Sequence, residues 1–359
     1  MLCCRAPLAG LMIVTALGMV SPSAVSRAQA QTAEDQAIDV FRGNQAIGAS
    51  DQSRIKAWVD SRVVVLVASA KADGPSALQA FRRAVESQRT KPGNSAAFRT
   101  ALAQQLGAVA ASRFADASPD RWTAQGMAQA MLEFNRVETF DGLVACLKSS
   151  TSVARYLCVR GRASQQRKIA GDSAKLSRVI GALKEAGEAE TDPVALAHIY
   201  LALSYPSQAS AVIDAYLAIL TKRIDLRRGV AVVVDRAEVD AFEFFRNATV
   251  IGAMNNDQKS RLVNALAVFL RADAQRYDTA DLLFAEIEAI EQRLQSNEGV
   301  LASLQNNGGG DIRGTLDKGG HAANRQAVLA EAYRWVGDPG SNTAGALNQP
   351  PWDVAVGAP

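Results

Sequence analysis

The sequence predicts an all-α protein built from antiparallel helix pairs that stack in a row. Phe140–Gly161 has the pattern of two short helices with apolar stripes, which fold back on each other across the polar turn Lys148–Ser152. A similar turn and helix follow at Glu190–Leu203, where Val194 comes 41 residues after Val153. This spacing lies within the period of about 40–47 residues that is typical of stacked helix pairs. An irregular helical bundle is the alternative architecture.

Residues 1–30 have the features of a cleaved export signal. Arg5 supplies a positive charge, Leu8–Val20 is an apolar run, and Ala28–Ala30 (Ala-Gln-Ala) fits a cleavage site. The run is shorter than the roughly 20 residues that a membrane-spanning helix needs, and no later segment is apolar enough to span a bilayer. We therefore expect an exported, soluble mature chain in the periplasm or the extracellular space. An uncleaved anchor is the alternative.

Residues 31–136 are predicted to form an N-terminal helical region. Pro75 opens a helix at its first turn, where the missing N–H costs nothing, and Leu78, Phe81 and Val85 mark one face of that helix. The β-branched run Val63–Val67 taken alone resembles a strand, but its surroundings have a mixed period and we expect a helix there.

Residues 137–296 are predicted to hold the repeated helix pairs. The expected helices are Phe140–Lys148, Ser152–Ile169, Ser173–Ala186, Pro193–Leu203, Ser207–Lys222, Ala237–Asn247, Gln258–Ala274 and Asp278–Leu294. Between two of them, Gly229–Val234 is a second strand-like run, for which an extended link and a helix start are equally compatible with the sequence.

The composition changes after this region. Residues 297–321 are rich in glycine and asparagine and are expected to be a flexible linker. Residues 322–336 have the apolar pattern of one more helix, and residues 337–359 are expected to be a disordered tail. In that tail Trp352 follows two prolines, so that it either anchors a partner as a docking peptide or packs on the last helix of its own chain.

The segment LKSSTSVARYLCVRG, which begins at Leu147, resembles the HEAT-repeat family. The resemblance is best over residues 139–203, where Val153 and Arg155 match the opening of the family's second helix and Asp192-Pro193-Val194 fits its turn. Leu196 departs from the pattern, because a basic residue would stand there. The resemblance implies a HEAT-like α-solenoid that serves as a binding scaffold, and it carries no active-site residue over to this chain.

Two cysteines, Cys146 and Cys158, remain in the predicted mature chain. Export would permit a disulfide between them. With the turn centred near Ser150, however, Cys158 would lie one helical turn beyond the residue opposite Cys146, near or past the limit of about 7 Å between bonded Cα atoms. This geometry favours two buried free thiols, with a disulfide as the alternative.

Charge and motif content exclude several functional classes. The chain has 39 basic and 36 acidic residues, and removal of Arg5 and Arg27 with the signal leaves 37 and 36, which argues against a nucleic-acid-binding surface. The two histidines, His198 and His321, and the cysteines do not have the spacing of a metal site, and we expect no cofactor. Neither cysteine has a base beside it that would make it a nucleophile.

The sequence therefore favours a protein–protein interaction or scaffolding module, not an enzyme, with a protein partner expected. An enzyme, or an enzyme's accessory subunit, that acts on a cell-envelope polymer is the alternative. A cleft that brings two acids together would favour the enzyme. The residues proposed for an interaction surface are Arg155, Arg162, His198, Arg223 and Trp352.

Overall fold

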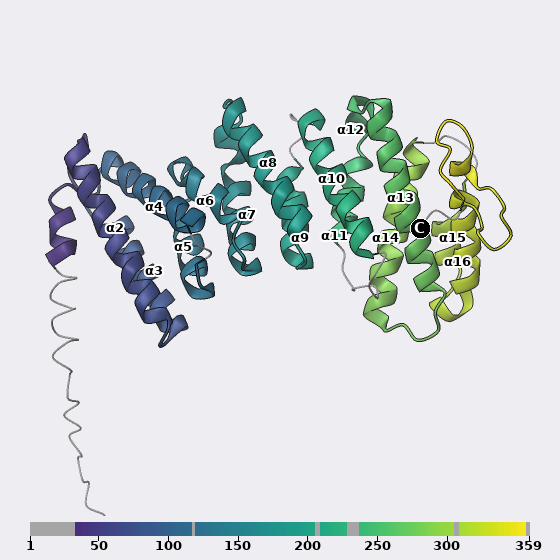
Figure 1. Cartoon of the computed structure of the whole chain (residues 1–359), viewed down its shortest axis with the longest axis horizontal. Coiled ribbons are helices and arrows are strands. Elements are labelled where there is room, and N and C mark those ends of the chain that lie inside the picture. Colours follow the sequence, from purple (N-terminus) through teal and green to yellow (C-terminus); the bar gives the residue numbers. More distant parts are fainter. Residues whose placement is uncertain (1–32, 117–118, 205–208, 228–236, 305–308, 357–359) are drawn as a thin grey trace, which may run out of the picture.

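The computed structural model describes residues 33–116, 119–204, 209–227, 237–304 and 309–356. Within these ranges the protein is all-α, and its only β pairing is an isolated bridge between Asp338 and Thr343. The predicted signal peptide, residues 1–30, lies outside the described residues. The helices form an elongated row that follows the order of the chain (Figure 1). They are α2 (Ala49–Ala70), α3 (Gly74–Thr90), α4 (Ala96–Asp116), α5 (Arg121–Phe134), η1 (Val137–Thr139), α6 (Phe140–Cys146), α7 (Ser152–Ile169), α8 (Ser173–Ala189), α9 (Pro193–Leu203), α10 (Ala209–Arg227), α11 (Ala237–Phe245), α12 (Ala248–Ala253), α13 (Asn256–Tyr277), α14 (Phe284–Leu304), α15 (Ile312–Leu316), α16 (His321–Val336) and η3 (Ala346–Asn348).

The row has two layers. Most helices pack on the neighbouring helices of their own layer and on helices of the other layer. The first layer contains α2, α4, α6, α8, α10, α13 and α16. The second layer contains α3, α5, α7, α9, α11 and α14. One core of buried apolar side chains runs between the layers from Ile38 to Val354. The prediction of an all-α stack of helices that pack in chain order is confirmed.

Short polar residues set the start of many helices. Asp73, Asp120, Asp172 and Asp192 each accept a hydrogen bond from a backbone N–H in the first turn of the helix that follows. Asn255 and Gln258 form a reciprocal capping box at the start of α13. Such caps stabilise a helix by about 1 kcal/mol each and fix where it begins.

The strand-like run Val63–Val67 lies inside α2, as expected. The residues of α2 that face the core are spaced by three and four along the chain, and they include Val59, Val63 and Leu66. Val64 and Val65 face solvent. The second strand-like run, Gly229–Val234, lies outside the described residues.

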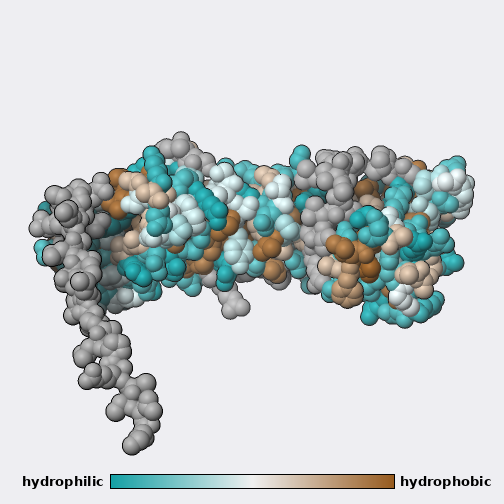
Figure 2. Space-filling model, turned by 90° about the horizontal axis from the view of Figure 1, so that it is seen from below, coloured by the Kyte–Doolittle hydropathy of each residue, from teal (hydrophilic) through white to brown (hydrophobic). Residues whose placement is uncertain are grey.

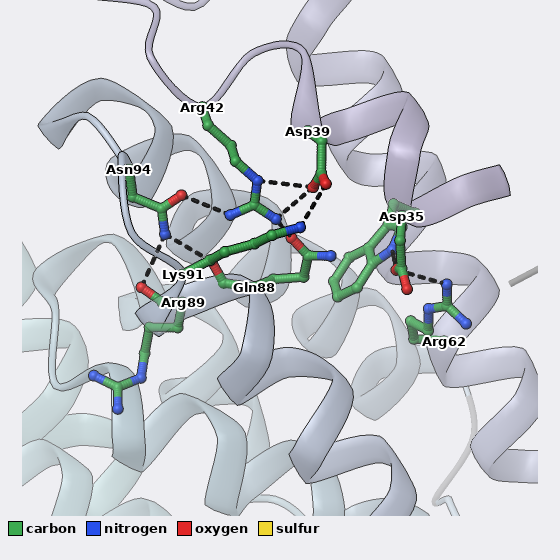
Figure 3. A network of polar contacts seen from close by, with 9 residues as sticks. Asp35, Asp39, Arg42, Arg62, Gln88, Arg89, Lys91 and Asn94 are labelled. Atoms are coloured by element: carbon green, nitrogen blue, oxygen red, sulfur yellow. Dashed lines mark hydrogen bonds and ion pairs between the residues drawn. The ribbon is translucent and has the colours of Figure 1, made fainter. Parts of the chain in front are cut away.

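Residues 33–48 cover the N-terminal end of the row and are held there by polar contacts (Figure 3). Asp39 accepts hydrogen bonds from Arg42 and from Lys91, which follows α3. Arg42 also donates to Asn94 Oδ1 over 2.8 Å, and Asp35 accepts hydrogen bonds from Trp58 and Arg62 of α2. The contacts tie the first segment to α2 and to the turn between α3 and α4.

The flexible linker expected over residues 297–321 is largely absent. Residues 297–304 continue α14, and residues 312–316 form α15. The glycines that suggested flexibility allow close packing instead: a Cβ at Gly309 would lie 2.1 Å from the Trp335 ring, and one at Gly310 would lie 2.1 Å from the backbone oxygen of Glu331. Both contacts are with α16, so a larger residue would push α16 away.

The sequence predicted a disordered tail over residues 337–359, and this prediction is wrong for the described part of the tail. Leu347 is fully buried, and Trp352 and Val354 pack against the core. The backbone N–H of Val354 donates to the oxygen of Leu347 over 2.8 Å. The tail lacks long helices, but burial of these apolar side chains on the end of the row holds it in place.

The expectation of two free thiols is wrong, because Cys146 and Cys158 form a disulfide with their Cα atoms 6.2 Å apart. The estimate from the sequence assumed an ordinary distance between the two helix axes. Gly161 of α7 lies so close to Leu143 of α6 that an added Cβ would be 3.1 Å from it. This close approach brings the cysteines within bonding range.

None of the described helices is both long enough and apolar enough to cross a membrane.

Candidate functional site

Helix α9 carries no charged residue. Its sequence, PVALAHIYLAL, is apolar on every side, a pattern typical of a helix buried all round. Yet Val194 is 59% and Leu201 is 53% exposed, and together with Ala197 and His198 they form one face at spacings of three and four. An apolar face left in solvent on an uncharged helix is a mark of a binding surface.

This face of α9 lines a groove of about 620 Å³ on the second layer. Its walls come from three helices that are consecutive in that layer: Val194, Ala197 and His198 of α9, Val239 and Asp240 of α11, and Ala285, Ala289 and Gln292 of α14. The volume falls in the range of sites that hold a small ligand or a few peptide side chains. The alanines of α14 are too short to fill the space between the helices.

Among the described residues, His198 and Asp240 are the ionisable groups that line the groove. Burial lowers the pKa of His198 and the charge of Arg160 lowers it further, against the opposing effect of Asp240. Burial raises the pKa of Asp240, an effect that His198 opposes and Glu243 reinforces. The lowered pKa of His198 favours the neutral imidazole, and Asp240 is the acidic group of the groove.

Tyr156 contacts a residue of the groove, and two apolar side chains are exposed where α14 begins. The ring of Tyr156 on α7 meets the ring of His198 edge to face, with 4.8 Å between the ring centres, and the Arg160 guanidinium lies 5.6 Å from the centre of the Tyr156 ring. At the start of α14, Leu283 and Phe284 are 71% and 81% exposed. The view from below shows apolar patches within the hydrophilic surface along the row, one of them broad and in the C-terminal half (Figure 2).

Two arginines expected on an interaction surface are instead buried in ion pairs. Arg155 donates two hydrogen bonds of 2.6 Å to Glu190, whose side chain is fully buried. Arg223 donates a hydrogen bond of 2.8 Å to Glu238, whose side chain is also fully buried. Each arginine compensates a carboxylate that the packing of the helices removes from water, so neither is available to a partner.

The remaining predicted surface residues do not come together. The side chain of Arg162 lies outside the described residues. His198 is in the groove, whereas Trp352 packs against the core at the C-terminal end of the row. Of the five predicted surface residues, the structure thus places one in the groove.

Sequence reasoning missed Asp240, Tyr156 and the exposed face of α9. The sequence did hold one signal for α9, because eleven residues without a charge are unusual for a helix with a face in solvent. No signal pointed to Asp240, because Asp240 and the residues of α9 in the groove lie far apart in the sequence and only the fold brings them together.

A second cavity, of about 510 Å³, lies between α11, α14 and α16 and contains three carboxylates. Glu298 accepts hydrogen bonds from the backbone N–H groups of Ile312 and Arg313. Asp311 caps the same short helix, and Glu243 pairs with Arg246. Burial raises the pKa of Glu298 although these N–H groups oppose the shift. All three acids are engaged in holding α14, α15 and α11 in place.

Among the described residues, no group of three or more histidine, cysteine or acidic side chains is arranged to hold a metal ion. Comparison with family models, curated proteins and solved structures gave no match for this chain.

Proposed function

We propose that this chain is an exported helical-repeat protein that binds another protein through the groove formed by α9, α11 and α14. The observation that carries the proposal is the uncharged helix α9, which turns Val194 and Leu201 to solvent. A monomeric stack gains nothing from such a face, whereas a partner that covers it would remove its apolar surface from water.

Two further features support the proposal. Residues 139–203 resemble HEAT repeats, and stacked helix pairs of this kind present long surfaces to protein partners. The Cys146–Cys158 disulfide is compatible with an oxidising compartment, as expected for a chain with an export signal over residues 1–30.

The groove supports binding better than it supports hydrolysis of an envelope polymer. Asp240 is the single carboxylate among the described residues that line it. Hydrolysis of a glycosidic bond normally needs two facing carboxyl groups. The second cavity has more acids, but they serve as helix caps and ion-pair partners.

Site-specific photo-crosslinking in the native cell tests the proposal. The photoreactive residue p-benzoylphenylalanine replaces Ala197 on the groove face of α9. A matched control carries it at Asp257, which is exposed on α13 in the first layer. We expect a discrete cross-linked protein from position 197 and none from position 257. Equal cross-linking from both positions, or none from position 197, would reject the groove as a docking surface.

A further inference from the structure

Asp240 is half-buried in the wall of the groove and has no hydrogen-bond donor among the described residues. Three other buried carboxylates are paired with arginines: Glu190 with Arg155, Glu238 with Arg223 and Asp273 with Arg293. No described residue forms an ion pair or a hydrogen bond with the Asp240 side chain. Its ionisable neighbours are His198, whose pKa is lowered by burial, and Glu243, whose negative charge raises the pKa of Asp240.

The surroundings of Asp240 make this lack of a donor costly. The groove around it is lined mainly by Val194, Ala197, Val239, Ala285 and Ala289. A carboxylate in such an apolar setting attracts a cation more strongly than a carboxylate in water does. A ligand that brings a positive group to Asp240 and apolar groups to the walls would satisfy both parts of the site.

We propose that the groove takes a peptide segment of a partner protein in which a lysine or arginine is flanked by apolar residues, with the cationic group on Asp240. This inference rests on the proposed binding function and names the chemistry of its partner. The aliphatic stem of a lysine or arginine would lie along Val194 and Val239, and its charged end would reach the carboxylate. The neighbouring apolar side chains would fill the space above the short alanines of α14.

Selection from a phage-displayed random peptide library tests the inference. The bait is the purified chain over residues 31–359 with its disulfide intact. We expect the selected peptides to share one lysine or arginine between aliphatic or aromatic residues. A fluorescein-labelled copy of one such peptide should bind about tenfold more weakly to Asp240→Asn in an anisotropy titration. Asp257→Asn, which removes an exposed acid from α13, should leave the affinity unchanged.

Replacing the basic residue of the peptide by norleucine completes a double-mutant cycle. The change should weaken binding to the unmodified protein but have little further effect on Asp240→Asn, because the two groups act on each other. Equal effects of norleucine on both proteins would overturn the assignment of the cation to Asp240.

A groove-blocking variant separates this inference from the proposed function. Val194→Arg places a competing cation beside Asp240, and Val64→Arg is its matched control on α2. Peptides that lose binding to Val194→Arg but lack a basic residue, or are insensitive to Asp240→Asn, would refute the inference and leave the groove as a docking surface. Failure to select any peptide, or equal binding to both arginine variants, would reject the proposed function as well.

Discussion

At the scale of single residues, buried arginine–carboxylate pairs recur along the row. Arg223 with Glu238 and Arg293 with Asp273 each join two helices, and Arg155 of α7 is paired with Glu190, which directly follows α8. The acid in each pair is at most 1% exposed. Such pairs add little net stability over apolar residues, but loss of one partner leaves a charge in the core.

Replacing Arg155 by methionine should therefore lower the free energy of unfolding by about 3 kcal/mol, because Glu190 would keep its charge without its main partner. Two backbone N–H groups, of Thr191 and Asp192, would remain as donors. The measurement is urea unfolding followed by circular dichroism. Arg178→Met is the control, since Arg178 and Asp141 are both more than half exposed and their pair should contribute about 1 kcal/mol or less. Similar losses for both variants would contradict this account of the buried pair.

At the scale of elements, residues 33–48 depend on charge to remain on the end of the row. Burial by itself would raise the pKa of Asp39, but the hydrogen bonds and charges of Lys91 and Arg42 outweigh it and hold the pKa below its ordinary value. A depressed pKa means that the folded contact favours the ionised form. Its stabilisation is present above the ordinary pKa of an aspartate and is lost as the pH falls through the lower folded value.

Asp39→Asn should loosen this segment at pH 7 and have a smaller effect near pH 3, below the ordinary pKa of an aspartate. The group is partly exposed, so we expect a loss of about 1 kcal/mol, or roughly fivefold in the hydrogen-exchange protection of residues 33–48 at pH 7. Exchange measured by mass spectrometry, corrected for intrinsic rates at each pH, tests this. Asp60→Asn, which removes an exposed pair with Lys56 on α2, should leave the protection of the segment unchanged. A loss that persists undiminished at pH 3 would show that the charge of Asp39 is not responsible.

At the scale of the whole molecule, the open row needs a cover at each end, because every inner helix is shielded by neighbours on both sides. The segment 33–48 covers the N-terminal end, and the tail after α16 covers the C-terminal end (Figure 1). Stability in such stacks comes from contacts between neighbours, so an uncovered end unfolds first.

Ending the chain at Gly337 should expose the side of α16 on which Leu347 and Val354 pack. We expect a local loss of about 3 kcal/mol or more, because burial of each of two large apolar side chains contributes roughly 1.5–3 kcal/mol. Hydrogen exchange in α16 should rise more than tenfold, while exchange in α5 stays the same. A shorter truncation that removes residues 357–359 is the control. Unchanged exchange in α16 after the longer truncation would contradict the capping role of the tail.

The sequence by itself determined the helical class and most helix positions, because the spacing of apolar residues and the capping side chains act within one or two turns. Asp192-Pro193 marks the start of α9, and the periods in α2 outweigh the β-branched run Val63–Val67. The tertiary structure alone decided which polar residues are buried, because that depends on contacts between distant parts of the chain. Packing turned Arg155 inward, joined Cys146 to Cys158, docked the tail and placed Asp240 of α11 beside His198 of α9.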